Sequence, residues 1–246
     1  SDLTGDIAAP ADVHFKLVAE KKEITLASGA KVDAWTYNGK IAPILHVKQG
    51  EIVRVKLVNK DINKGVSIHW HGYNVPNAMD GVPGMTQNAV QPGESFTYKF
   101  RAKQVGTYWF HSHQQASEQV LKGLFGALIV DPKQETPSAD KEFVVINHRW
   151  ETDQGRRKAF GKEDQVQLKQ VEPGKKVKLR IINTHNISRM YLFQGVDYKI
   201  TAIDGMPIHD PDRLSGNTAF RLAAGGRYDV TFTMPDHPVH FKMGGH

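Results

Sequence analysis

Alternating hydrophobic and polar residues run through most of the chain and predict β-strands rather than helices. In residues 51–59, apolar side chains at every second position alternate with Arg54 and Lys56, which is the two-residue period of a half-buried strand. Residues 95–101 repeat this period with aromatic side chains, and residues 125–130 form an apolar run typical of a buried strand. The other predicted elements are strands at 142–147, 176–183, 198–203 and 228–233 and a short helix at 116–122.

Turn residues between these segments and one polar stretch predict two all-β domains. Residues 132–141 are polar, contain two prolines and follow an apolar strand, which places a domain boundary near 134 and gives domains at 1–133 and 134–246. A short repeat supports a duplication. Lys-Gln-Gly-Glu precedes the predicted strand that ends at Asn59, and Glu-Pro-Gly-Lys precedes the one that ends at Asn183. Short strands with Pro and Gly turns favour two antiparallel Greek-key β-sandwiches.

The composition excludes several types of functional site. None of the 246 residues is cysteine, which excludes disulfides, thiolate zinc sites, cysteine-linked haem, cysteine nucleophiles and the thiolate-dependent type 1 blue copper site. The net charge is +6 and each half contributes +3 without a basic cluster, so nucleic-acid binding is not expected. No apolar run approaches the roughly 18 residues that a membrane-spanning helix needs.

Two His-X-His pairs stand at the ends of predicted strands, one at His69 and His71 and the other at His111 and His113. Residues i and i+2 of a strand face the same side, so two adjacent strands would present four imidazoles on one face. A single pair would more often belong to an ordinary sheet, but two pairs with aromatic neighbours favour a metal site. Imidazole without thiolate suits copper, zinc, nickel or iron. The aromatic residues expected to wall the imidazoles are Trp70, Tyr108, Trp109 and Phe110.

Four sequence blocks carry a resemblance to a known family: His-Trp-His-Gly at 69–72, Met-Asp-Gly-Val-Pro-Gly at 79–84, Gln-Pro-Gly-Glu-Ser-Phe at 91–96 and Gly-Thr-Tyr-Trp-Phe-His-Ser-His at 106–113. In order and spacing they resemble the first cupredoxin domain of the laccase-like multicopper oxidases. Asp-Gly-Met-Pro at 204–207 and Gly-Gly-Arg-Tyr-Asp-Val at 225–230 are similar to the middle domain of that family, which carries no copper. The resemblance spans residues 40–246 and implies two cupredoxin-like Greek-key β-sandwich domains.

The resemblance implies a trinuclear copper cluster that reduces O2 to water, held by four histidines of the first domain and four of the last. By this match, His69 would bind the type 2 copper, His71 and His111 would share one type 3 copper, and His113 would bind the other. Asp80 matches an acidic residue near the cluster and would assist proton delivery. The implied partners are O2 and a small reducing substrate, a phenol or a metal ion. The implied location is extracellular, periplasmic or at the cell surface.

The part of the family pattern that holds the type 1 copper has no counterpart here. The last domain of these enzymes carries a His-Cys-His motif and a second His-X-His motif, and this chain has neither. Residues 236–240 contain His237 and His240, and with no alternating strand expected after them they are interpreted as the end of the middle domain. We therefore expect a third cupredoxin domain, in a longer protein or in another chain, to complete the cluster. The 246-residue chain alone is expected to be inactive as an oxidase.

Two other functions stay open on the sequence alone. The first is a non-enzymatic copper-binding or structural protein of the cell envelope with the cupredoxin fold, although the presence of all four paired histidines argues against a purely structural role. The second is an assembly in which histidines from different copies of the chain complete a site. The remaining histidines are interpreted as surface or packing residues: His14, His46, His148, His185, His209, His237, His240 and His246.

Overall fold

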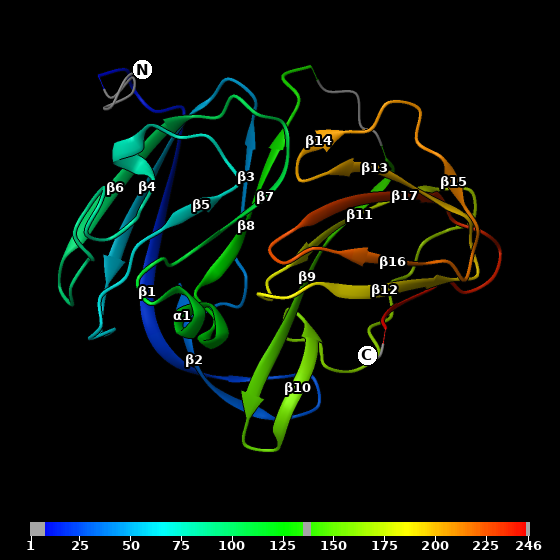
Figure 1. Ribbon diagram of the computed structural model, residues 1–246, viewed down its shortest axis with the longest axis horizontal. Helices are drawn as coiled ribbons and strands as arrows, with labels where there is room; N and C mark the ends of the chain where they lie inside the picture. Colours follow the sequence, from blue (N-terminus) through cyan, green and yellow to red (C-terminus); the bar gives the residue numbers. More distant parts are fainter. Residues whose placement is uncertain (1–7, 135–138, 245–246) are drawn as a thin grey trace.

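Strands of the first half of the chain form two four-stranded sheets in the computed structural model, which describes residues 8–134 and 139–244. One sheet has the order β2-β1-β4-β6 and the other β3-β8-β7-β5. The elements are β1 (Val13–Thr25), β2 (Lys31–Tyr37), β3 (Ile44–Lys48), β4 (Ile52–Asn59), β5 (His69–His71), the 3-10 helix η1 (Asn77–Met79), β6 (Ser95–Arg101), β7 (Gly106–His111), α1 (Ala116–Lys122) and β8 (Phe125–Asp131). The sheets pack face to face as a β-sandwich on one side of the molecule (Figure 1).

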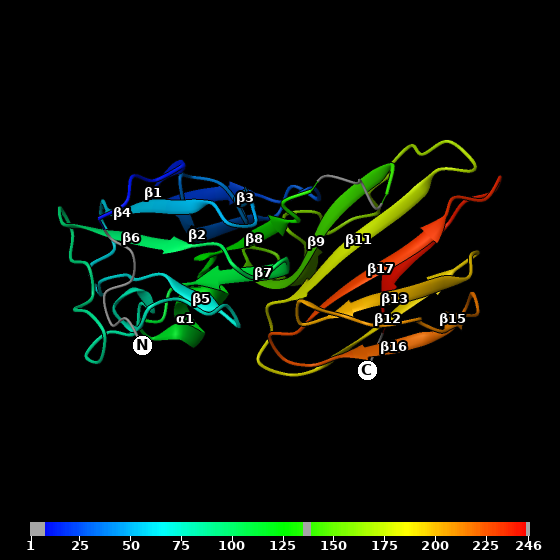
Figure 2. The ribbon, with the colours of Figure 1, turned by 90° about the horizontal axis from the view of Figure 1, so that it is seen from above.

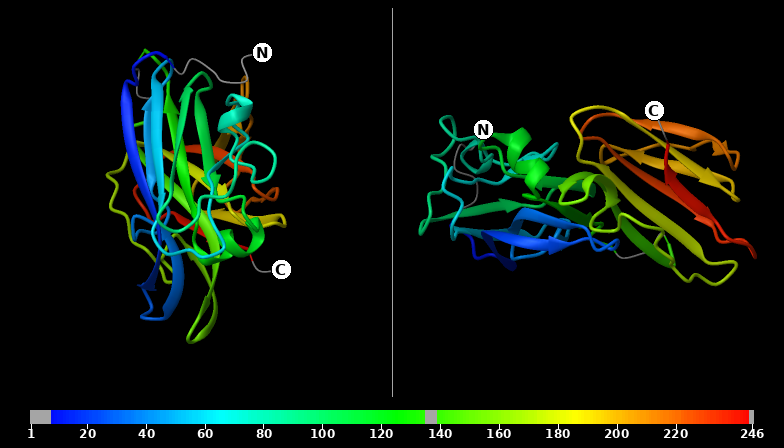
Figure 3. Two further views of the ribbon diagram at one scale, coloured as in Figure 1. Left: turned by 90° about the vertical axis from the view of Figure 1, so that its left-hand side faces the viewer. Right: turned by 90° about the horizontal axis from the view of Figure 1, so that it is seen from below.

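Strands of the second half form another sandwich beside the first (Figures 2 and 3). One sheet has the order β10-β9-β11-β17-β13-β14 with β15 added to β13, and the other has the order β16-β12-β18. The strands are β9 (Lys141–Thr152), β10 (Gly155–Phe160), β11 (Lys176–Asn183), β12 (Arg189–Gln194), β13 (Tyr198–Ile203), β14 (Met206–Pro207), β15 (Arg213–Leu214), β16 (Ala219–Leu222), β17 (Arg227–Thr233) and β18 (His240–Met243). The predicted all-β class with two β-sandwiches is confirmed.

The alternation seen in the sequence decides which side chains enter the first core. Val53, Val55 and Leu57 of β4 are fully buried, whereas Arg54 and Lys56 between them are exposed. Burial of each such aliphatic side chain contributes about 1.5–3 kcal/mol, so the alternation fixes which face of the strand turns inward.

The short internal repeat marks equivalent strands. β4 pairs in parallel with β1 and antiparallel with β6, and β11 likewise pairs in parallel with β9 and antiparallel with β17. Asn59 and Asn183 end β4 and β11, and both are fully buried. Each amide nitrogen donates to a carbonyl of the loop that follows, Ile62 for Asn59 and Ile187 for Asn183. Each also donates to a carbonyl more distant in sequence, Val90 for Asn59 and Ala223 for Asn183. The asparagines therefore end their strands in the same way in both sandwiches.

Two predictions about individual strands need correction. The predicted strand at 142–147 is part of the longer β9, which continues because His148 and Trp150 are buried against Phe125 of the first sandwich. The expectation that no strand follows His237 is wrong, since β18 begins at His240 and pairs antiparallel with β12. Other predicted bounds agree closely, including 95–101, 116–122, 176–183 and 198–203. Residues 135–138 of the predicted linker, and His246, lie outside the described residues.

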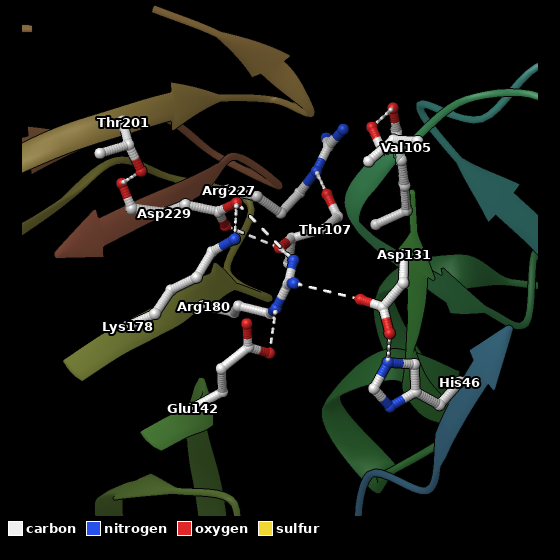
Figure 4. Close-up of polar contacts among 11 residues, drawn as sticks. His46, Val105, Thr107, Asp131, Glu142, Lys178, Arg180, Thr201, Arg227 and Asp229 are labelled. Atoms are coloured by element: carbon white, nitrogen blue, oxygen red, sulfur yellow. Dashed lines mark hydrogen bonds and ion pairs between the residues drawn. The ribbon is translucent and has the colours of Figure 1, made fainter. Parts of the chain in front are cut away.

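A cluster of charges around the buried Arg180 joins the two sandwiches (Figure 4). The Arg180 guanidinium of β11 is only 4% exposed and lies 3.6 Å from the Asp131 carboxylate of β8. It also donates to Thr107 Oγ1 of β7 at 2.8 Å and lies near Glu142 (3.3 Å) and Asp229 (3.7 Å). Because a buried charge is unfavourable without partners, these contacts hold the two sandwiches in one relative position. Within the described residues, no helix is both long and apolar enough to cross a membrane.

Candidate metal centre

Strands β5 and β7 bring the two histidine pairs onto one face. They pair antiparallel with His69 opposite His111 and His71 opposite Trp109, and directly opposed residues share a face of the sheet. His113 follows two residues after the end of β7. The imidazole ring centroids are 5.1 Å apart for His69 and His113, 5.4 Å for His71 and His111, and 5.5 Å for His69 and His111. The structure therefore gathers all four predicted histidines.

Backbone carbonyls set the tautomer of two of these rings. His69 Nδ1 lies 2.8 Å from the Asp80 carbonyl oxygen, and His111 Nδ1 lies 3.0 Å from the Ser112 carbonyl oxygen. A carbonyl can only accept, so each Nδ1 carries a proton, and in the neutral ring the lone pair is then on Nε2. A ring nitrogen fixed by a carbonyl in this way is the usual support of a metal-ligating imidazole.

One pair of nitrogens has the spacing of two ligands of one ion. His71 Nδ1 and His111 Nε2 are 3.3 Å apart. Imidazole binds zinc at about 2.0–2.1 Å, and at a similar bond length two nitrogens at this separation fit one ion at a near-tetrahedral angle. Among residues 8–134 and 139–244, no three His, Cys, Asp or Glu side chains gather tightly enough to hold one ion. The described part of the chain thus offers paired ligation and leaves further positions to other donors.

The turn that carries Asp80 packs directly against β5. Gly81 has a φ of +71°, and an added Cβ would overlap the Ile68 carbonyl oxygen, so a side chain cannot be placed there. This close backbone approach brings the Asp80 carbonyl to His69. The carboxylate is adjacent, with Asp80 Oδ1 3.4 Å from His69 Nδ1. The predicted proton-delivery residue is therefore in contact with the cluster.

A buried polar network behind the imidazoles has no obvious signal in the sequence apart from Ser112, which lies inside a His-X-His pair. Ser112 Oγ donates to Gln119 Oε1 of α1 and accepts from Ser67 N at 3.2 Å. Ser67 Oγ accepts from His113 N at 3.2 Å, and Gln119 Nε2 donates to the Gly65 carbonyl at 2.8 Å. The network ties both histidine segments to one short helix, because Ser67 stands just before β5 and Ser112 just after β7.

A family model described as Multicopper oxidase matches residues 18–135, and a second with the same description matches residues 130–243. The chain belongs to the multicopper oxidase family. Membership implies a copper cofactor, and the imidazole donors found here suit copper.

Curated relatives are similar in sequence over part of their length. Copper resistance protein A of Escherichia coli is 41% identical over 153 residues, which are 61% of this chain and 25% of that protein. Laccase-2 of Botryotinia fuckeliana is 41% identical over 121 residues, which are 48% of this chain and 20% of that protein. The chain thus spans about a quarter or less of the length of these relatives.

Solved structures show the same fold over almost the whole chain. Blue Copper Oxidase from Nitrosomonas europaea has a TM-score of 0.85 and 28% identity, and the match covers 94% of this chain and 79% of that one. A multi-copper oxidase from Pseudomonas thermotolerans has a TM-score of 0.86 and 28% identity, covering 95% and 61%.

Burial keeps three of the four clustered imidazoles of this multicopper oxidase chain neutral. Desolvation, followed by the nearby Arg227 charge, lowers the pKa of His71 to about 4. Desolvation lowers the pKa of His111 to about 3, although the hydrogen bond to the Ser112 carbonyl acts in the opposite direction. Burial also lowers the pKa of His113. At neutral pH these rings are therefore in the unprotonated form that binds a metal.

Of the four aromatic residues predicted to border the imidazoles, Trp109 alone does so. Trp109 does face the cluster, with its ring 4.8 Å from His71 and 4.7 Å from His111. Trp70 and Phe110 belong to the opposite face of the sheet and pack on each other in the core, 5.5 Å apart. Tyr108 likewise packs on Tyr73, outside the cluster. The period of two that aligns the histidines turns their immediate neighbours away.

Proposed function

We propose that His69, His71, His111 and His113 bind copper and form half of a trinuclear, O2-reducing centre in a laccase-like multicopper oxidase. The observation that carries this proposal is the convergence of four imidazoles, from β5, β7 and the residues just after β7. Copper supplies the one-electron redox chemistry when it is bound. The substrate would be a small reductant, a phenol or a metal ion, with O2 as the electron acceptor.

The four histidines divide into three roles in this proposal. His71 Nδ1 and His111 Nε2 together hold one type 3 copper, which their 3.3 Å separation supports. His69 serves the type 2 copper through Nε2, because its Nδ1 proton is engaged by the Asp80 carbonyl. His113 serves the second type 3 copper.

Asp80 is proposed to deliver protons to the centre. Its carboxylate is about one-third exposed, so it can exchange protons with water, and Oδ1 lies 3.4 Å from His69 Nδ1. A carboxyl group that touches both solvent and the cluster can pass a proton across that boundary.

The remaining ligands and the electron entry are proposed to come from a further cupredoxin domain, of the same protein or of another chain. The sequence contains no cysteine, so a type 1 copper thiolate cannot come from these residues. We expect the isolated chain to show no oxidase turnover with phenols or metal ions.

We also infer a domain boundary near residue 134, where the two family matches meet. We further infer an extracellular, periplasmic or cell-surface location for the protein.

Copper titration of the 246-residue chain tests the proposal. Bound Cu(II) is measured by equilibrium dialysis, and nitrogen coupling is recorded by electron paramagnetic resonance. A variant with all four paired histidines replaced by alanine should lose this binding, whereas a control with His237→Ala and His240→Ala should retain it. Equal binding by the four-histidine variant and wild type would refute the copper site.

Oxygen uptake tests the need for a further domain. With a phenol or a reducing metal ion, copper-loaded chain should consume no O2 above a copper-free control. Turnover that disappears in the four-histidine variant would show that the chain is sufficient and would refute that part of the proposal.

A further inference from the structure

The second sandwich touches one of the clustered imidazoles through its main chain. The loop between β16 and β17 places Gly225 against the edge of His71. An added Cβ at Gly225 would lie 2.8 Å from both Cε1 and Nε2 of that ring and 3.6 Å from Trp109 Cζ2. The sandwich that carries neither His-X-His pair therefore borders a proposed copper ligand.

Hydrogen bonds hold Gly225 in this place. Its carbonyl accepts from Trp109 Nε1 at 3.0 Å and from Arg227 Nη1 at 3.4 Å. Its N–H donates to the His185 carbonyl at 3.2 Å. Arg227 is anchored in turn, because its Nε donates to the Thr107 carbonyl of the first sandwich at 3.1 Å. The contact with His71 is thus part of a bonded interface.

Trp109 contacts a face of the same ring. It stacks on His71 with a centroid separation of 4.8 Å and an interplanar angle of 30°. The same indole donates to Gly225, so a ring of its own sheet bounds a face of His71 and the backbone of the other sandwich bounds an edge. A ring bounded in two directions has few other orientations open to it.

We propose that Gly225 is a positioning residue for the copper site and that the second sandwich sets the orientation of His71. The inference rests on the proposed function, because it takes His71 as a ligand. A side chain at position 225 would push the ring by about 0.6 Å, since ordinary contact with a Cβ begins at 3.4 Å. Functional sites need their groups placed within about 0.5 Å, so the 3.3 Å spacing to His111 would be lost.

The chain offers a matched control for the test variant. Gly225 has a φ of +66°, so Gly225→Ala introduces backbone strain as well as the clash with His71. Gly161 has a φ of +60°, lies in the same half of the chain, and has no atom within 4 Å of an added Cβ. Gly161→Ala therefore carries the same kind of strain without the contact.

Two readouts compare the variants after circular dichroism has confirmed folding. Cu(II) affinity of the full chain should fall by about 10–100-fold in Gly225→Ala, which is the loss typical when contacts that support a metal ligand are removed. In Gly161→Ala the Cu(II) affinity should be unchanged. In copper-free protein, the imidazole resonances of His71 should shift in Gly225→Ala and not in Gly161→Ala. Equal behaviour of the two variants in both measurements would overturn the proposal.

A second variant covers the case in which Gly225→Ala does not fold. Trp109→Phe keeps an aromatic ring beside His71 and removes the hydrogen bond to the Gly225 carbonyl, so the His71 resonances should again shift and Cu(II) affinity should fall. Wild-type values for both quantities would overturn the proposal. His71→Ala distinguishes failure of the proposed function from failure of this inference. Unchanged copper binding in His71→Ala would count against His71 as a copper ligand and so against the proposed function. The His71 resonances of copper-free Gly225→Ala would still show whether Gly225 positions His71.

Discussion

The strand pairs β5–β7 and β12–β18 occupy corresponding places in the two sandwiches. Each pair is antiparallel, and its first strand follows the loop after a buried asparagine. The inward residues are similar, with Trp70 opposite Phe110 in the first pair and Phe193 opposite Phe241 in the second. The outward residues differ: at the positions of His69, His71 and His111 the second pair has Leu192, Gln194 and Lys242.

This difference separates what the fold requires from what the site requires. The inward aromatic layer is present in both sandwiches, so it belongs to the packing of the fold. The histidines are found on the outward face of one pair, outside the aromatic core layer. The following predictions test this division, beginning with the largest expected effect.

Removal of an inward ring should destabilise either sandwich to a similar degree. Phe110→Ala and Phe193→Ala each empty a fully buried site, so we expect the free energy of unfolding to fall by about 3–5 kcal/mol. His71→Ala, on the outward face, should lower it by less than about 1 kcal/mol. Denaturant unfolding followed by circular dichroism measures all three. A loss in His71→Ala as large as in the phenylalanine variants would contradict the division.

Acid should weaken the contact between the sandwiches at His148. Desolvation lowers the pKa of this buried side chain to about 3, whereas an unfolded histidine has a pKa of about 6.5. Between those values the unfolded chain binds a proton that the folded chain does not, so stability is complete above pH 6.5 and falls with pH by about 1.4 kcal/mol per unit.

His148→Gln isolates this contribution from the other buried histidines. Unfolding free energies measured over a pH series from about 7 to 4.5 should fall less steeply in the variant than in wild type. Parallel curves would show that His148 is protonated in the folded protein and would refute the assigned neutral state.

The two strand-ending asparagines should be equivalent. Asn59→Ala and Asn183→Ala each leave buried loop carbonyls without their donor, and each should lower the free energy of unfolding by about 1–3 kcal/mol. Thermal and denaturant unfolding measure the pair under the same conditions. A much larger loss of stability at one position would contradict the interpretation that the two asparagines have the same structural role in both halves.

Exposed ion pairs should matter least in both sandwiches. Glu118 pairs with Lys64 at 2.7 Å in the first, and Glu151 pairs with Arg156 at 2.8 Å in the second. Both are solvent-exposed, so Glu118→Gln and Glu151→Gln should each change stability by less than about 1 kcal/mol. Added salt should reduce even that difference, and an effect that persists in high salt would point to a structural role for the pair.

The predictable part of the site follows from local periodicity. The spacing His69-X-His71 and His111-X-His113 was sufficient to predict convergence, because a strand returns every second side chain to one face. The same rule explains a wrong expectation, since Trp70 and Phe110 are each next to one of these histidines along a strand and must face the core. Local alternation also missed β18, whose pattern after His240 spans too few residues to stand out.

The sequence by itself determined the class of fold, the strands that carry the histidines and the exclusion of thiolate chemistry, because alternation and composition are local properties. Only the tertiary structure decided that Gly225 borders His71, that Gln119 supports Ser112, and that Arg180 joins Asp131 across the sandwiches. These contacts join residues distant in sequence. They depend on how strands are ordered and sheets are packed, which the pattern of any single segment does not specify.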